Sequence, residues 1–197
     1  MAVRDDFSAG EVLAAADLND TFAAKLDYPS GGANGDALIK DGASAVWGSA
    51  GRIVQVVQDS DGSVRSTTST SFVDVPLLSV DIAPVFSDSA IYVFATGWVR
   101  VDSTTSGSPE GKYQITDGSN NAIPRAEDVR FGIIAQPRSS DSLLRNQVGM
   151  SLIGRDTPAT TGTVTYKLRF ASNIAGTTNN LLGNTVTSQI IAMEVRI

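Results

Sequence analysis

Residues 163–170 read TVTYKLRF, and this stretch decides the fold class. Apolar and polar side chains alternate along it, so that one side carries Val164, Tyr166, Leu168 and Phe170. Because successive side chains of a strand point to opposite faces, a period of two predicts a strand with one face on a core and the other in water. That pattern is typical of antiparallel sheets.

The last stretch, residues 188–197 (SQIIAMEVRI), alternates in the same way. The sequence predicts that the larger apolar side chains of this strand face the core and that Ala192, Glu194 and Arg196 form its polar face. The predicted core positions are Ile191, Met193, Val195 and Ile197.

Further short apolar stretches lie upstream, each bounded by turn residues. They are residues 52–58, 75–82, 90–101, 111–116, 129–136 and 148–154. About eight strands in roughly 145 residues predict an antiparallel β-sandwich, of the jelly-roll type, over residues 52–197. The predicted fold class is therefore mainly β.

The composition excludes several kinds of chemistry. The chain of 197 residues has no cysteine and no histidine, which excludes disulfides, Cys-ligated zinc, thiol nucleophiles and histidine-based triads. With 15 Lys and Arg against 21 Asp and Glu, the net charge is −6 and the cations are scattered, so we do not expect a nucleic-acid partner. No apolar run approaches the ~18 residues that span a bilayer, so we expect no membrane insertion.

One acidic segment resembles the start of a calcium loop. Residues 59–62 read DSDG, but the twelfth position of such a loop, where an EF-hand needs glutamate, is Thr70. Aspartates beside a glycine between two strands are also common in hairpin turns. We therefore interpret the segment as a turn and predict no metal site.

The carboxylates do not form a convincing catalytic pair. Glu127 and Asp128 are adjacent, so on a strand they would point to opposite faces, and the pattern places Glu194 on a polar face. Glycoside hydrolysis needs two carboxyl groups about 5 to 10 Å apart in a cleft. We predict that the protein is not an enzyme and has no cofactor.

Two groups of residues could contact a ligand. Residues 138–145 (RSSDSLLR) could form a surface loop at a ligand, although a plain connection between strands is the simpler interpretation. Aromatic residues in the predicted strands could form a sugar platform, although such residues are more often part of a core. These aromatic residues are Tyr92, Trp98, Tyr113 and Tyr166.

The first 28 residues are predicted to form a helical anchor arm. Leu18, Phe22 and Leu26 recur four residues apart and would form one apolar stripe, and Tyr28-Pro29 would end the helix. A single short helix with one apolar stripe is not stable alone in water, so the stripe needs a partner. That partner is either the chain's own domain or another molecule.

Residues 29–51 are rich in glycine, alanine and serine and are predicted to form a linker. Two apolar positions in it, Leu38 and Trp47, are interpreted as small anchors. The predicted partner-binding residues are thus Leu18, Phe22, Leu26, Leu38 and Trp47.

Several segments resemble tailed-bacteriophage virion structural proteins that combine an N-terminal arm with a C-terminal jelly roll. The leader FSAGEVLAAADLNDTFAAK (residues 7–25) is similar to a leader common in such proteins, and residues 31–49 (GGANGDALIKDGASAVWGS) are similar to their linker. Residues 51–58, 66–84, 164–170 and 188–197 resemble strands of their C-terminal domain. Two positions depart from the pattern, with Ala14 in place of the usual threonine and Asp88-Ser89-Ala90 before the third strand.

The resemblance implies a non-enzymatic virion component, usually a homotrimer on the outer surface of a capsid or tail. The chain passes from arm to linker to head without a long shaft, which favours a capsid decoration or cement protein that binds the major capsid protein. A tail-fibre protein or adhesin that binds a tail component and recognises host surface polysaccharide is the alternative. In either case the arm and linker residues would bury apolar surface against a lattice or sister chains.

Overall fold

The computed structural model describes residues 37–41, 44–48, 52–104, 108–132, 144–183 and 187–196. The chain divides into two units, Met1–Ala50 and Gly51–Ile197, which are described separately. Among the described residues no helix is long and apolar enough to cross a membrane. The predicted helix of the arm, with Leu18, Phe22 and Leu26, lies outside the described residues, as does Ile197.

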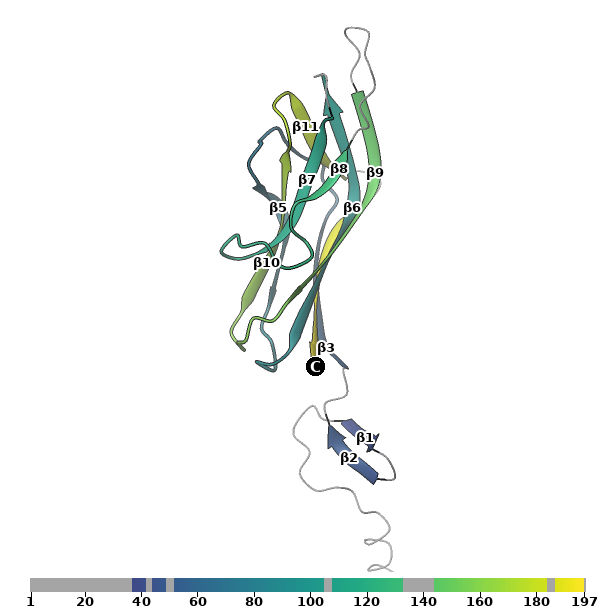
Figure 1. Ribbon diagram of the computed structural model, residues 1–197, viewed down its shortest axis with the longest axis vertical. Helices are drawn as coiled ribbons and strands as arrows, with labels where there is room; N and C mark the ends of the chain where they lie inside the picture. Colours follow the sequence, from purple (N-terminus) through teal and green to yellow (C-terminus); the bar gives the residue numbers. More distant parts are fainter. Residues whose placement is uncertain are drawn as a thin grey trace, which may run out of the picture. The chain divides into compact units, whose positions relative to one another are not determined.

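The first unit contains a two-stranded antiparallel hairpin within the range that we predicted as a linker. Strand β1 (Ala37–Asp41) pairs with β2 (Ser44–Gly48), and Leu38 is the register partner of Trp47. The two predicted anchors of this range are therefore neighbours across one hairpin (Figure 1). The sequence analysis did not predict strands here, because its glycine and alanine content is typical of linkers.

The second unit is an all-β head, and its strands confirm the predicted fold class. Every strand-like stretch of the sequence analysis from residue 52 onward coincides with a strand in its described part; residues 133–136 of the stretch 129–136 lie outside the described residues. The strands are β3 (Arg52–Asp61), β4 (Arg65–Thr67), β5 (Val73–Ile82), β6 (Ala90–Ser103), β7 (Glu110–Asp117), β8 (Val129–Gly132), β9 (Leu144–Asp156), β10 (Val164–Ser172), β11 (Thr177–Leu182) and β12 (Ser188–Arg196).

β3 and β4 are the two halves of one interrupted strand, and β11 and β12 are the two halves of another. The long strand β6 pairs with β12 along its first half and with β11 along its second half, and both run antiparallel to it. β3 pairs with β12 and β4 with β11 in the same manner. Residues 59–62 therefore do not form the predicted hairpin turn: they lead into a break between β3 and β4, which continue in one direction.

When β3 and β4 are counted as one strand and β11 and β12 as another, the described part of the head has the strand pairing of a jelly roll. The first strand (β3/β4) pairs with the last (β11/β12), β5 with β10, β6 with β9, and β7 with β8. This nested pairing is that of one long hairpin, rolled up so that β12 also pairs with β6 and β10 with β7. The result is two facing antiparallel sheets, which is the jelly-roll arrangement.

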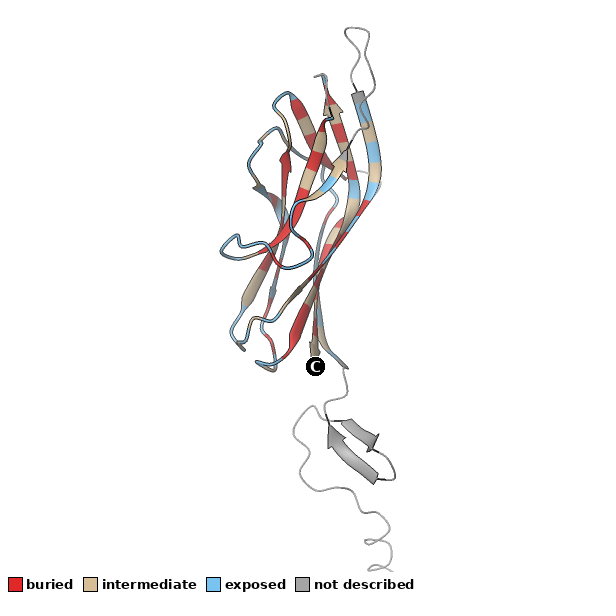
Figure 2. Ribbon diagram, viewed as in Figure 1, coloured by how far each residue is buried: buried red, intermediate tan, exposed pale blue. Residues whose placement is uncertain are grey.

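The core lies between the two sheets, and Figure 2 shows buried residues, in red, along strands of both sheets. The β5-β10-β7-β8 sheet contributes fully buried Tyr113, Tyr166 and Phe170, and the other sheet contributes Ile91 and Ile190. Strand β10 faces the core with the predicted residues.

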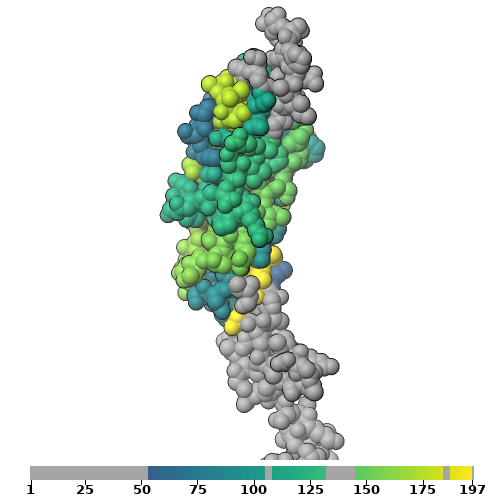
Figure 3. Space-filling model, viewed as in Figure 1, coloured from purple at the N-terminus to yellow at the C-terminus, as the bar shows by residue number. Residues whose placement is uncertain are grey.

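The first and last described residues of the head lie side by side, because Arg52 at the start of β3 is the register partner of Arg196 at the end of β12. Figure 3 shows residues from the beginning and from the end of the head close together.

The predicted orientation of β12 is wrong. Ile190, Ala192 and Glu194 point inward and are completely buried, whereas Ile191, Met193 and Val195 are half-buried on the outer face. Both faces of this strand carry apolar residues, so the alternation defined two faces but not which of them is inside.

Candidate interaction surface

The outer face of the sheet formed by β3, β12, β6 and β9 carries large apolar side chains on all four strands. Strand register places Met193 opposite Tyr92, and Ile191 opposite Phe94. On the other side of β6, Phe94 is opposite Ile153. Residues directly opposite one another in an antiparallel pair lie on the same face, so these side chains are contiguous.

The apolar rows continue onto the edge strand β3. Val56 is the register partner of Met193, and an irregularity of the pairing near Glu194 brings Ile53 opposite Val195. We call the whole set the outer apolar patch: Ile53, Val56, Tyr92, Phe94, Ile153, Ile191, Met193 and Val195.

The outer apolar patch is open to solvent at its margins. Ile53 is 60% exposed, Val56 54% and Ile153 50%, and the other members are half-buried. A scattered exposed leucine or valine is ordinary, but a contiguous apolar patch on a protein surface marks an interaction site or a ligand site. The next row along the face is uncharged, consisting of Ser60, Gln189, Thr96 and Ser151.

The outer face of the opposite sheet, β5-β10-β7-β8, carries charged and polar side chains that pair with one another. On β10, Lys167 Nζ lies 3.0 Å from Asp74 Oδ2, Arg169 Nε lies 2.7 Å from Asp74 Oδ1, and the Thr165 hydroxyl donates to Asp81 at 2.6 Å. This face is covered by ion pairs and hydrogen bonds, as expected for the solvated side of an antiparallel sheet. The outer apolar patch is therefore not a general property of this head.

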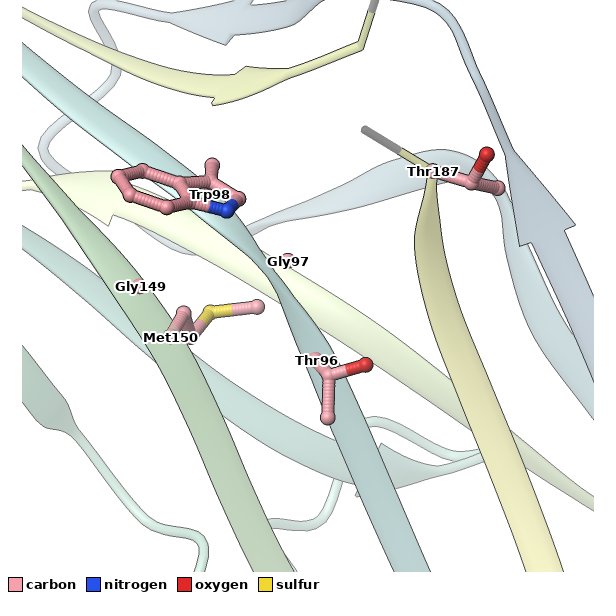
Figure 4. A pocket seen from close by; sticks show the side chains of 6 residues that line it. All are labelled: Thr96, Gly97, Trp98, Gly149, Met150 and Thr187. Atoms are coloured by element: carbon pink, nitrogen blue, oxygen red, sulfur yellow. The ribbon is translucent and has the colours of Figure 1, made fainter. Parts of the chain in front are cut away.

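A shallow hollow with an exposed tryptophan lies farther along the same face as the outer apolar patch (Figure 4). Trp98 on β6 is 41% exposed and is the register partner of Gly149 on β9. A Cβ at Gly149 would meet no atom within 4 Å, so the backbone lies open opposite the indole ring. The lining consists of Thr96, Gly97, Trp98, Gly149, Met150 and Thr187.

Charged groups lie farther along the same face, beyond Trp98. Asp102 accepts hydrogen bonds from Arg100 Nε and Arg145 Nε, each at 2.8 Å, and from Asn180 Nδ2 at 3.1 Å. The Arg145 side chain is 54% exposed. In the hollow itself, an indole ring and two threonine hydroxyls offer one stacking surface and hydrogen-bonding groups.

Glu194 is a buried structural carboxylate rather than part of a polar outer face. It accepts hydrogen bonds from the backbone N–H groups of Val85 and Phe86, at 2.9 and 3.1 Å, and from Gln55 Nε2 at 2.7 Å. Burial by itself would raise the pKa of Glu194, but these hydrogen bonds to the charged form outweigh it and the pKa lies below its ordinary value. Glu194 thereby fixes the connection between β5 and β6 to the sheet.

The four aromatic residues considered as a sugar platform do not come together. Tyr113 and Tyr166 are in the core, and the Tyr113 hydroxyl donates to Asn179 Oδ1 at 2.6 Å inside the head. Tyr92 belongs to the outer apolar patch and Trp98 to the hollow. The core interpretation thus holds for two of the four.

Of the five predicted partner-binding residues, only Leu38 and Trp47 are among the described residues, as the hairpin pair of the first unit. Residues 138–143 of the predicted ligand loop also lie outside them. Within the described ranges no cluster of acidic side chains could hold a metal ion. Asp61, from the acidic segment, is 7% exposed and pairs with Arg65 Nε at 2.6 Å.

Sequence reasoning did not identify the outer apolar patch, although one signal of it was present. Residues 90–95 read AIYVFA, an uninterrupted apolar run typical of a strand that is buried on both faces. One face of this run lies on the core, and the other forms the centre of the patch.

The comparisons with known proteins were made for the whole chain. No protein-family model and no curated protein matches it. Similar solved structures come from infectious bursal disease virus. A mutant VP2 protein in T=1 particles is 12% identical with a TM-score of 0.30, covering 80% of this chain and 40% of that chain. The T=13 viral particle is 12% identical with a TM-score of 0.31, covering 81% and 41%.

A VP2 subviral particle of the same virus is 11% identical with a TM-score of 0.30, covering 81% of this chain and 43% of that chain. The chain therefore spans about two fifths of the length of these structures. Because the TM-scores are low, the assignment of a jelly roll depends on the strand pairing within this chain. These neighbours belong to infectious bursal disease virus and not to a tailed phage.

Proposed function

We propose that the protein is a structural component of a virus particle, specifically a trimeric capsid decoration protein of a tailed phage. It binds the major capsid protein through its N-terminal arm and presents the jelly-roll head on the outer surface. The observation that carries the proposal is a jelly-roll head with a contiguous outer apolar patch, since such a surface is suited to packing against other subunits. The resemblance of the arm and linker segments to phage virion proteins supports it.

The proposed role needs no catalytic group. Apolar contacts that join several capsid subunits would resist the outward pressure of packaged DNA, and each Å² of apolar surface buried contributes roughly 25 cal/mol. In this role Leu18, Phe22 and Leu26 of the arm, with Leu38 and Trp47 of the hairpin, are the anchoring residues.

A reconstitution experiment tests the anchor. Particles that lack the protein are incubated with the full chain, with a chain lacking residues 1–27, or with a chain in which Leu18, Phe22 and Leu26 are changed to serine. We expect only the full chain to sediment with particles. The matched control changes Asn19 and Asp20 to serine, on the polar side of the predicted helix, and should bind normally.

Abundance and position then distinguish a capsid from a tail component. A decoration protein should be present in purified virions at a copy number comparable to that of the major capsid protein and should give density over the shell. Binding of the truncated chain to particles would show that the anchor is elsewhere, and density confined to the tail would contradict the decoration role.

The second candidate function is an adhesin that recognises host surface polysaccharide. The hollow at Trp98 favours it, because the exposed indole and two threonine hydroxyls suit a saccharide. The test measures binding of host polysaccharide to the wild-type chain, to Trp98→Ala, and to the control Trp47→Phe, by fluorescence and by inhibition of phage adsorption. Binding that Trp98→Ala leaves intact would contradict this use of the hollow.

A further inference from the structure

We propose that the outer apolar patch is the surface through which copies of this chain pack against one another. The contact joins the same patch of two copies, so it is two-fold and pairs two chains, and it does not depend on the trimer of the proposed function. It can be tested with purified protein in the absence of any particle, so the proposed interface and the proposed function can fail separately.

The shape of the patch fits another copy of itself. It is the broad face of a sheet, spread over β3, β12, β6 and β9. Two sheet faces pack against each other about 10 Å apart with interdigitated side chains, as the two sheets inside this head already do. In a contact between two such patches, the isoleucine, valine, phenylalanine and methionine side chains of one copy would face side chains of the same kinds on the other.

The face is large enough to supply more than half of one side of a standard subunit interface. Four strands at ~4.8 Å spacing, over about eight residues at ~3.4 Å each, cover roughly 500 Å². A stable interface of standard size buries about 800 Å² on each partner, with an apolar centre and a polar rim. The outer apolar patch supplies the centre, and the uncharged row of Ser60, Gln189, Thr96 and Ser151 supplies part of the rim.

The distribution of charge also permits contact between identical copies. The chain has a net charge of −6, yet the described outer positions of this sheet carry a single carboxylate, Asp102, which is already bonded to Arg100 and Arg145. Asp102 lies beyond Trp98 and outside the patch. Two copies can therefore meet here without bringing unpaired carboxylates together, and the charged residue beside the patch is Arg155, the register partner of Tyr92.

The experiment places a charge on the patch at two exposed positions of different strands. Val56→Glu on β3 and Ile153→Glu on β9 change side chains that are 54% and 50% exposed, so the fold should be retained. The matched control is Leu77→Glu on β5 of the opposite sheet, where the side chain is 66% exposed. Circular dichroism and thermal unfolding of each full-length variant establish that it is folded.

Sedimentation equilibrium of the full chain then gives the association constant. We expect the wild type and Leu77→Glu to form the same oligomer, and Val56→Glu and Ile153→Glu each to raise the dissociation constant at least ten-fold. A wild type that stays monomeric at its highest soluble concentration would overturn the proposal. So would folded Val56→Glu and Ile153→Glu variants that associate like the wild type, because another surface, the arm or a different protein would then be the partner.

Discussion

The two outer faces of the head belong to two different antiparallel sheets and differ in what covers them. On the β5-β10-β7-β8 sheet, Lys167 and Arg169 pair with Asp74. On the other sheet, the equivalent outward positions of β12 and β6 are occupied by Ile191, Met193 and Phe94. Both sheets bury their inner side, so the difference lies in the outer faces, one covered by ion pairs and the other by apolar side chains.

The largest expected effect distinguishes the two faces of β12. Ile190 is completely buried between the sheets and Ile191, the next residue, is on the outer face. Ile190→Ala should lower the free energy of unfolding by about 2–5 kcal/mol, and Ile191→Ala by less than about 1 kcal/mol in the monomer. Urea denaturation in a Val56→Glu background, which removes the proposed association, measures both, and equal losses would contradict the assignment of the inner face.

The next effect compares a glutamate in each sheet. Glu194→Gln removes a charged acceptor from the backbone N–H groups of Val85 and Phe86 and should cost about 1–3 kcal/mol of stability. Glu110→Gln on β7 should change stability little, since its partner Arg130 is largely exposed. Chemical denaturation of both variants at pH 7 tests this, and similar losses would mean that Glu194 is not a structural carboxylate.

Acid should destabilise the head through carboxylates whose pKa values are lowered by folding. Burial opposes this shift in Glu194, Asp61 and Asp117, but hydrogen bonds lower the pKa of each. A depressed pKa in the folded state contributes stability that is complete above the ordinary value of about 4 and is lost as the pH falls through the folded value. Unfolding free energies should therefore be flat from pH 8 to pH 5, because the chain has no histidine, and decline below about pH 4.

Part of this acid sensitivity should depend on Glu194 alone. Glu194→Gln should have a shallower decline at low pH than the wild type, measured by urea denaturation at several pH values. An identical pH profile would contradict the lowered pKa of Glu194.

The smallest effect concerns the charged outer face. Asp74 is about half exposed, so its ion pairs with Lys167 and Arg169 are screened by water. Asp74→Asn should cost about 0.5 kcal/mol at low salt and less at high salt. Thermal unfolding at two salt concentrations measures it, and a large or salt-independent loss would mean that this face is not simply solvated.

Much of the fold could be predicted from the sequence because most strands contain short alternating or continuous apolar runs. In the head, the strands that were missed, β4 and β11, are the short halves of interrupted strands. β11 reads TTNNLL, in which buried Asn179 bonds the Tyr113 hydroxyl, so a polar residue occupies a core position. Such a position is recognised only when its partner on another strand is known.

The surface was harder to predict than the fold. Alternation could not decide which side of β12 is inside, because both sides are apolar and the inward side contains Ala192 and Glu194. The outer apolar patch joins residues from four strands that are far apart in the sequence. Only the register of the rolled hairpin brings Val56, Phe94 and Ile153 to one face.

The place where the chain enters the head affects how the head bears load. Arg52 begins β3, and its register partner Arg196 ends β12 beside it. The hydrogen bonds to β12 run across β3, so a pull along the axis of β3 would act at right angles to them. A pull in that direction would load the whole β3–β12 ladder together in shear rather than opening it one bond at a time.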